Sequence, residues 1–172
     1  MKQIILLISI IGISFNALAQ YDNNRHEFRI DALEALVFPG LDISYEYILG
    51  NYSGAGVAVN VRLDSPNDDY EVFTLAPYYR QYFFDNAAYG IRGFYAEGLL
   101  QYTNGKDDRN NITLEVETYD DIGIGFGGGY KLIAPNGFVI DAGLDLGRNF
   151  KLDEASNDFF FRFGISIGYR FF

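Results

Sequence analysis

The chain has 172 residues and a formal net charge of -10, and it contains 16 Phe and 14 Tyr but no Cys. The acidic balance argues against nucleic-acid binding, which needs a basic surface. Without Cys there are no disulfides, so an exported domain of this composition has to be stabilised in another way.

The first residues predict a secretory signal peptide over residues 1–19. Lys2 gives a positive start, residues 4–13 are almost entirely apolar, and Ala17-Leu18-Ala19 has the small-x-small pattern of a cleavage site. A retained membrane helix is the weaker interpretation, because this apolar run is too short to span a bilayer comfortably. We therefore expect a mature domain over residues 20–172.

The remainder predicts eight strands in one domain without a linker. Turn signals such as Pro39-Gly40, Asn104-Gly105 and Asn136-Gly137 divide it at regular spacing. The predicted strands cover residues 26–38, 41–49, 54–63, 70–84, 91–103, 112–132, 137–150 and 158–172. The first of them is the least regular, because residues 32–36 could also form helix and Glu34 falls on the apolar face. A bulge or a short helical turn would explain this irregularity.

The last predicted strand shows the alternation most clearly. Between residues 161 and 171, aromatic and aliphatic side chains alternate with Arg162, Gly164, Ser166, Gly168 and Arg170. A period of two indicates a β-strand. One face is apolar throughout while the other carries full charges, a pattern typical of a strand between lipid and a polar barrel interior.

The sequence therefore predicts an all-β fold, an eight-stranded antiparallel up-and-down transmembrane β-barrel with a polar, side-chain-filled lumen. A lipocalin-like soluble barrel also has eight strands, but its apolar side chains point inward and its polar ones outward. Here the charged residues share a face with glycine, so the soluble alternative fits less well.

The inward face predicts a charge network in the lumen. Its members are Glu46, Arg62, Arg80, Glu97, Asp141, Asp145, Arg162 and Arg170. We favour a structural plug of ion pairs over a proton or ion path or a catalytic carboxylate pair, because buried charges need partners in any case.

Glycines on the inward face of the last three predicted strands should leave one wall of the lumen nearly bare. Large residues such as Tyr78, Arg80 and Tyr95 could reach across and fill this space. A ligand cavity against the bare wall is the alternative interpretation.

Nothing in the sequence favours catalysis. The only His is His26, and no nucleophile elbow, phosphate loop or metal-binding motif is present. We therefore expect no catalytic residue, no cofactor and no metal site, and we predict that the protein is not an enzyme. An outer-leaflet lipid-modifying enzyme is the least favoured alternative.

The hairpin around residues 104–118 carries a possible docking edge. Ile112, Leu114 and Val116 continue the apolar stripe of the sixth predicted strand beyond the length that a membrane crossing needs. A strand end at the lipopolysaccharide layer and a site for strand addition by a surface partner are both open interpretations.

Four segments resemble small eight-stranded outer-membrane barrels of the OmpA and OmpX transmembrane type. They also resemble, more closely, a family of uncharacterised outer-membrane proteins from Bacteroidetes-type bacteria. The segments are Leu41 to Tyr47, Ala76 to Phe83, Gly125 to Lys131 and Gly164 to Phe171. This resemblance implies a fold and a location in the cell outer membrane, and it implies no activity.

The expected partners follow from that location. They are outer-membrane lipid, lipopolysaccharide and the barrel-assembly machinery, for which Tyr169, Phe171 and Phe172 form the predicted assembly signal. We expect a monomer with a structural or surface-interaction role. A narrow channel or small-ligand transporter through the glycine-lined lumen is the alternative function.

Overall fold

The structure is a computed structural model. It describes residues 25–37, 40–62, 69–83, 91–107, 117–151 and 158–171. Phe172, the predicted signal peptide and the predicted docking edge Ile112, Leu114 and Val116 lie outside these residues. Within them, no helix is long and apolar enough to cross a membrane.

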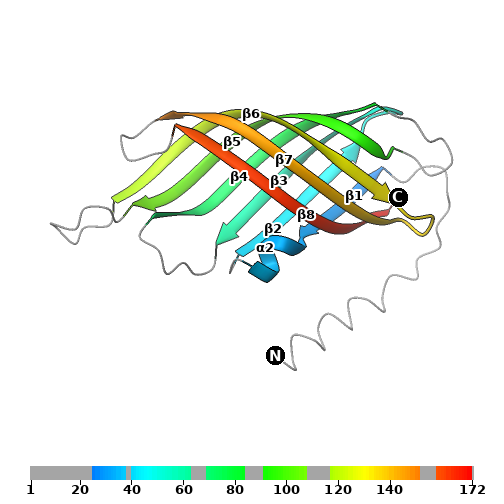
Figure 1. Cartoon of the computed structure of the whole chain (residues 1–172), viewed down its shortest axis with the longest axis horizontal. Coiled ribbons are helices and arrows are strands. Elements are labelled where there is room, and N and C mark those ends of the chain that lie inside the picture. Colours follow the sequence, from blue (N-terminus) through cyan, green and yellow to red (C-terminus); the bar gives the residue numbers. More distant parts are fainter. Residues whose placement is uncertain are drawn as a thin grey trace, which may run out of the picture.

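Eight antiparallel strands form a closed barrel in which each strand pairs with its neighbours in the sequence and β8 pairs with β1 (Figure 1). The elements are β1 (His26–Asp31), α2 (Ala32–Val37), β2 (Gly40–Ile48), β3 (Ser53–Arg62), β4 (Asp69–Tyr82), β5 (Gly93–Asp107), β6 (Glu117–Ile133), β7 (Phe138–Lys151) and β8 (Phe159–Phe171). The predicted eight-stranded up-and-down barrel is confirmed.

The two ends of the barrel differ in what they contain. Residues 25 and 171 and the turns at 49–52 and 134–137 lie at one end, which we call the terminal end (Figure 1). The other end, which we call the far end, holds the last residues of β3 and β5 and the first residues of β6 and β8.

The predicted first strand is wrong in its second half. β1 ends at Asp31, and Ala32–Val37 form a short helix, α2, so the helical turn is the correct explanation of the irregular pattern. The Asp31 carboxylate accepts hydrogen bonds from the backbone N–H groups of Leu33 (2.8 Å) and Glu34 (2.9 Å), which begins the helix. Glu34 consequently lies beside Arg62, at 3.5 Å, rather than on the lipid face.

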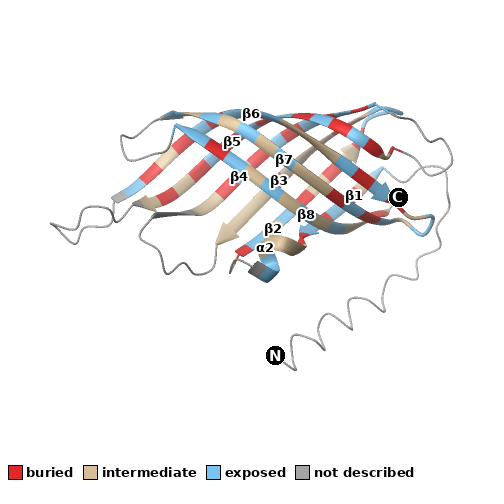
Figure 2. Cartoon of the chain, viewed as in Figure 1, coloured by how far each residue is buried: buried red, intermediate tan, exposed pale blue. Residues whose placement is uncertain are grey.

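Burial alternates along the strands (Figure 2), and the exposed positions are mostly apolar whereas the charged side chains are buried inside. Phe126, Phe161 and Ile124 on the outer surface are 71%, 64% and 49% exposed, whereas Glu27, Glu46 and Lys131 are all 0% exposed. A water-soluble barrel has the opposite arrangement, because its core is apolar. The inverted pattern is that of a barrel surrounded by lipid.

Candidate functional site

The charged residues of the lumen come from alternate positions on nearly every strand. β1 turns Glu27 and Arg29 inward while Phe28 and Ile30 stay exposed on the outside. On β6 and β7, Lys131 and Asp141 are register partners, so both side chains lie at the same height of the barrel. The period of two therefore collects charges of both signs inside one closed wall.

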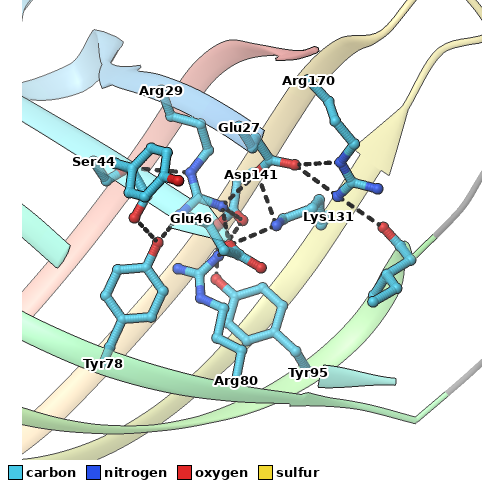
Figure 3. Close-up of polar contacts among 12 residues, drawn as sticks. Glu27, Arg29, Ser44, Glu46, Tyr78, Arg80, Tyr95, Lys131, Asp141 and Arg170 are labelled. Atoms are coloured by element: carbon cyan, nitrogen blue, oxygen red, sulfur yellow. Dashed lines mark hydrogen bonds and ion pairs between the residues drawn. The ribbon is translucent and has the colours of Figure 1, made fainter. Parts of the chain in front are cut away.

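Arg29 lies at the centre of this group and contacts three carboxylates from three strands (Figure 3). Its Nη1 atom is 2.9 Å from Glu27 Oε1, 3.0 Å from Glu46 Oε2 and 2.9 Å from Asp141 Oδ2. Its Nη2 atom donates to the Tyr78 hydroxyl at 2.6 Å. Nη1 carries two N–H groups, so its three carboxylate partners share them, while Nη2 serves Tyr78.

Lys131 and Arg170 extend the group towards the terminal end. Lys131 Nζ is 2.8 Å from Glu27 Oε1 and 2.8 Å from Glu46 Oε2. Arg170 donates from Nε (2.9 Å) and Nη2 (2.6 Å) to Glu27 Oε2, and also from Nη2 to the backbone carbonyl of Ile91 at 3.2 Å. Glu27 is thus held by three cations from three strands.

Arg80 completes the group on the opposite wall. It forms ion pairs with Glu97 and, at 2.6 Å, with Asp141. Its Cζ atom lies 4.1 Å from the centroid of the Tyr95 ring, within the range of a cation–π contact. The hydroxyl of Tyr95 in turn donates to Asp141 Oδ1 at 2.7 Å.

We call these eight side chains the closing network. They are Glu27, Arg29, Glu46, Arg80, Glu97, Lys131, Asp141 and Arg170, so four acids face four bases. Each is at most 8% exposed. Because buried charges are tolerated only when paired, a balanced set of this kind fills the lumen rather than lining an open path.

The structure places the predicted lumen residues in two groups. Glu46, Arg80, Glu97, Asp141 and Arg170 belong to the closing network. The other three, Arg62, Asp145 and Arg162, line a cavity nearer the far end, which Arg80, Glu97 and Asp141 also border.

Sequence reasoning missed Glu27, Arg29 and Lys131, three of the most deeply buried charges. The alternation of Glu27 and Arg29 with Phe28 and Ile30 could have found the first two. That signal was obscured because the helical pattern of residues 32–36 made the whole first strand look irregular. Lys131 lies two residues after Gly129, in the same alternating series as the inward glycines of β6. The period of two therefore places it in the lumen.

The cavity on the far-end side of the closing network has a volume of about 580 Å³. Besides a floor of Arg29, Arg80, Glu97 and Asp141 from the closing network, its charged lining consists of Asp31, Glu34, Asp42, Arg62, Asp145 and Arg162. The ion pairs here are looser, since Arg62 lies 3.5 Å from Glu34 and Arg162 lies 3.9 Å from Asp42. Among the described residues, no group of three or more His, Asp or Glu could hold a metal ion.

The glycine-rich wall is filled by two aromatic side chains. A Cβ at Gly143 would lie 2.5 Å from the Tyr95 hydroxyl, so this glycine makes room for a ring that reaches across from β5. A Cβ at Gly125 would lie 2.7 Å from the ring of Phe160, which is 7% exposed. The large-against-small packing expected from the sequence is present, with Phe160 as an unexpected participant.

The predicted assembly signal lies at the β1–β8 seam. Phe171 stacks on Phe28 with ring centroids 5.6 Å apart, and Tyr169 is the register partner of Phe28. His26, at the start of β1, lies 2.8 Å from the Tyr45 hydroxyl at the terminal end.

The β5–β6 hairpin is longer than a membrane crossing requires. Its pairing continues to Asp107 and Glu117, so the strands have 15 and 17 residues, whereas roughly 9 to 11 suffice to cross. Beyond the last outward apolar residue of β6, Ile122, the Asp120 carboxylate accepts hydrogen bonds from Asn104 (2.9 Å) and Tyr102 (2.7 Å), which lower its pKa. This part of the hairpin is polar and lies outside the apolar band.

Neither a protein-family model nor a curated protein sequence matches the chain. Among solved structures, the N-terminal β-barrel domain of Pseudomonas aeruginosa OprF is similar, with a TM-score of 0.55 and 16% sequence identity. The alignment covers 87% of this chain and 98% of that domain. At this identity the likeness concerns the fold alone, which is a closed barrel of eight antiparallel strands. The narrower resemblance to a Bacteroidetes-type family stays a prediction.

Proposed function

We propose that this chain is a monomeric outer-membrane β-barrel protein, exported with a cleaved signal peptide, whose role is structural or one of surface interaction rather than catalysis. The far end would face the cell exterior, with lipid and lipopolysaccharide around the apolar band. Tyr169, Phe171 and Phe172 would be read by the barrel-assembly machinery at the terminal end. Membership of a Bacteroidetes-type outer-membrane family is part of this proposal.

The observation that carries the proposal is the closing network inside an apolar outer wall. Arg29 and Arg80 both contact Glu46 and Asp141, which links β1, β2, β4 and β7 across the lumen. Such contacts stabilise the closed barrel and obstruct the passage of solutes. All carboxylates of the closing network have cationic partners, so none of them is available as a general base.

Fractionation and gel mobility test the location. The protein should appear in the outer-membrane fraction and migrate differently before and after boiling, because a lipid-stabilised barrel resists unfolding in detergent. A protein that remains soluble after export would contradict the proposal.

A narrow channel is the second candidate, favoured by the cavity of about 580 Å³ inside the lumen. Planar-bilayer recording separates the two functions. A closed barrel gives no stable conductance steps, whereas stable steps that change in Arg80→Ala would establish a path through the closing network. Lipid A that is altered when the gene is deleted would instead favour the enzyme alternative.

A further inference from the structure

The barrel wall has a notch between β8 and β2 in the half nearer the far end. β1 ends at Asp31, which pairs with Ser166, so residues 159–165 of β8 pair only with β7 among the described strands. On the other side of the notch, residues 40–42 of β2 pair only with β3. Hydrogen bonds between strands therefore do not close this part of the wall.

The short helix α2 lies in the notch. It contacts both β8 and β2, and Figure 1 shows it beside these two strands at the edge of the barrel. A helix of six residues satisfies its backbone groups differently from a strand and leaves the neighbouring strands apart. The notch is thus covered by side chains of α2 rather than sealed by a continuous sheet.

The lining of the cavity extends to this notch. Its lining includes Leu33 and Glu34 of α2, and also Phe161 and Phe163 of β8. These two phenylalanines are 64% and 53% exposed and belong to the apolar outer face of the barrel. A molecule in the cavity would therefore contact polar side chains inside the barrel and apolar side chains of β8 at the notch.

The cavity carries an excess of negative charge. Outside the balanced closing network, its described lining has four carboxylates, Asp31, Glu34, Asp42 and Asp145, against the two guanidinium groups of Arg62 and Arg162, which leaves a formal charge of -2. The arginines are held by long ion pairs of 3.5 and 3.9 Å on partly exposed side chains, which bind weakly. A positively charged group is favoured here, and the arginines tolerate a phosphate beside it.

We propose that the notch and the cavity form a binding site for an amphiphile whose head group carries an ammonium. The ammonium would lie among Asp42, Asp145 and Glu34, and the acyl chain would leave through the notch along Phe161 and Phe163. The volume of about 580 Å³ lies within the usual range for small-molecule sites, roughly 300 to 1,000 Å³. This inference rests on the proposed location of the barrel in a membrane.

Native mass spectrometry of the chain purified in neutral detergent tests the proposal. Lysophosphatidylethanolamine and lysophosphatidylglycerol with the same acyl chain are added at equal concentration. We expect at least tenfold more bound lysophosphatidylethanolamine, and at least a fivefold loss of it in Asp42→Asn/Asp145→Asn. The matched control Asp120→Asn, which removes a carboxylate outside the cavity, should bind as the unchanged chain does.

Three outcomes would overturn the proposal. They are equal retention of the two lipids, undiminished binding by the double variant, and binding of free phosphoethanolamine as tight as that of the acylated form. If the double variant does not fold, Glu34→Gln carries the same expectation. Heat-modifiable mobility of the same sample separates the inferences: a folded outer-membrane barrel without lipid preference removes the binding site and leaves the proposed function intact.

Discussion

The guanidinium of Arg80 on β4 lies 2.6 Å from the carboxylate of Asp141 on β7, although β5 and β6 separate these strands along the wall. This pair crosses the lumen and is almost completely buried. Breaking one half of such a pair leaves an uncompensated charge, which typically costs about 3 to 5 kcal/mol. The stability of the barrel should therefore depend on the pair more than on any ion pair at the rim.

A double-mutant cycle measures this coupling. Arg80→Met and Asp141→Leu should each lower the free energy of unfolding by about 3 kcal/mol or more, and the double variant should lose less than the sum by at least about 1 kcal/mol. The free energies of unfolding are obtained by measuring, at increasing urea concentrations, the fraction of protein that migrates as the folded band on a gel. The comparison pair Arg162 and Asp42, 3.9 Å apart and partly exposed, should couple by less than about 1 kcal/mol. Equal coupling of the two pairs would contradict the role assigned to the lumen pair.

Lys131 should be as important as the arginines, since it contacts both Glu27 and Glu46, as Arg29 does from β1. Lys131→Met leaves those carboxylates with too little positive charge and should cost about 3 to 5 kcal/mol of unfolding free energy. Adding Glu27→Gln removes the excess charge and should restore part of the loss. Lys106→Met, on the half-buried far end of β5, is the control and should change stability by no more than about 0.5 kcal/mol. A stable Lys131→Met would mean that Arg29, Arg80 and Arg170 suffice to balance the two carboxylates.

The sequence was sufficient to predict the number of strands, because most strands alternate with a period of two and residues such as Gly, Pro, Asn and Asp separate them. It also predicted which face of each regular strand is polar. Phe160 shows what the period of two can predict. It has an even number, as the inward residues Arg162 and Gly164 do, and it lies inside against the glycines of β6. Its position was predictable although its contacts were not.

The pairing of charges across the lumen was not predictable in the same way. Arg170 contacts Glu27, its register partner on β1, and Arg162 contacts Asp42 on β2. A contact between residues that are not register partners, such as Arg162 and Asp42, depends on the tilt and stagger of the strands. These arise only when the sheet closes. Local patterns also could not decide between strand and helix for residues 32–37, and the notch follows from that choice.

The contact between Gly143 and Tyr95 predicts a severe effect from a single methyl group. In Gly143→Ala the new Cβ would lie 2.5 Å from the Tyr95 hydroxyl and displace its hydrogen bond to Asp141, at a cost of about 1 to 3 kcal/mol. Adding Tyr95→Phe removes the hydroxyl and should recover part of this loss. Gly98→Ala, where a Cβ meets no atom within 4 Å, is the matched control and should not destabilise the barrel. Equal urea midpoints for Gly143→Ala and Gly98→Ala would contradict the packing argument.

Asp31 holds α2 in the notch by accepting hydrogen bonds from the N–H groups of Leu33 and Glu34. Asp31→Ala removes both bonds and should destabilise the helix by about 0.5 to 2 kcal/mol. The amide hydrogens of Leu33 and Glu34 should consequently exchange faster, by roughly 2- to 30-fold. Asp31→Asn keeps an acceptor oxygen and should exchange nearly as the unchanged chain does. Mass spectrometry after hydrogen exchange gives both comparisons.

The same variant distinguishes local opening of the notch from loss of the barrel. Because β1 ends at Asp31 and pairs through residues 26–31, release of α2 breaks no pairing between β1 and β8. The amide of Arg170 in β8, which donates to the carbonyl of Gly137 in the turn before β7, should therefore exchange at an unchanged rate in Asp31→Ala. Faster exchange throughout β8 would show that α2 supports the seam itself, whereas faster exchange confined to α2 would show that it covers the notch independently of the barrel.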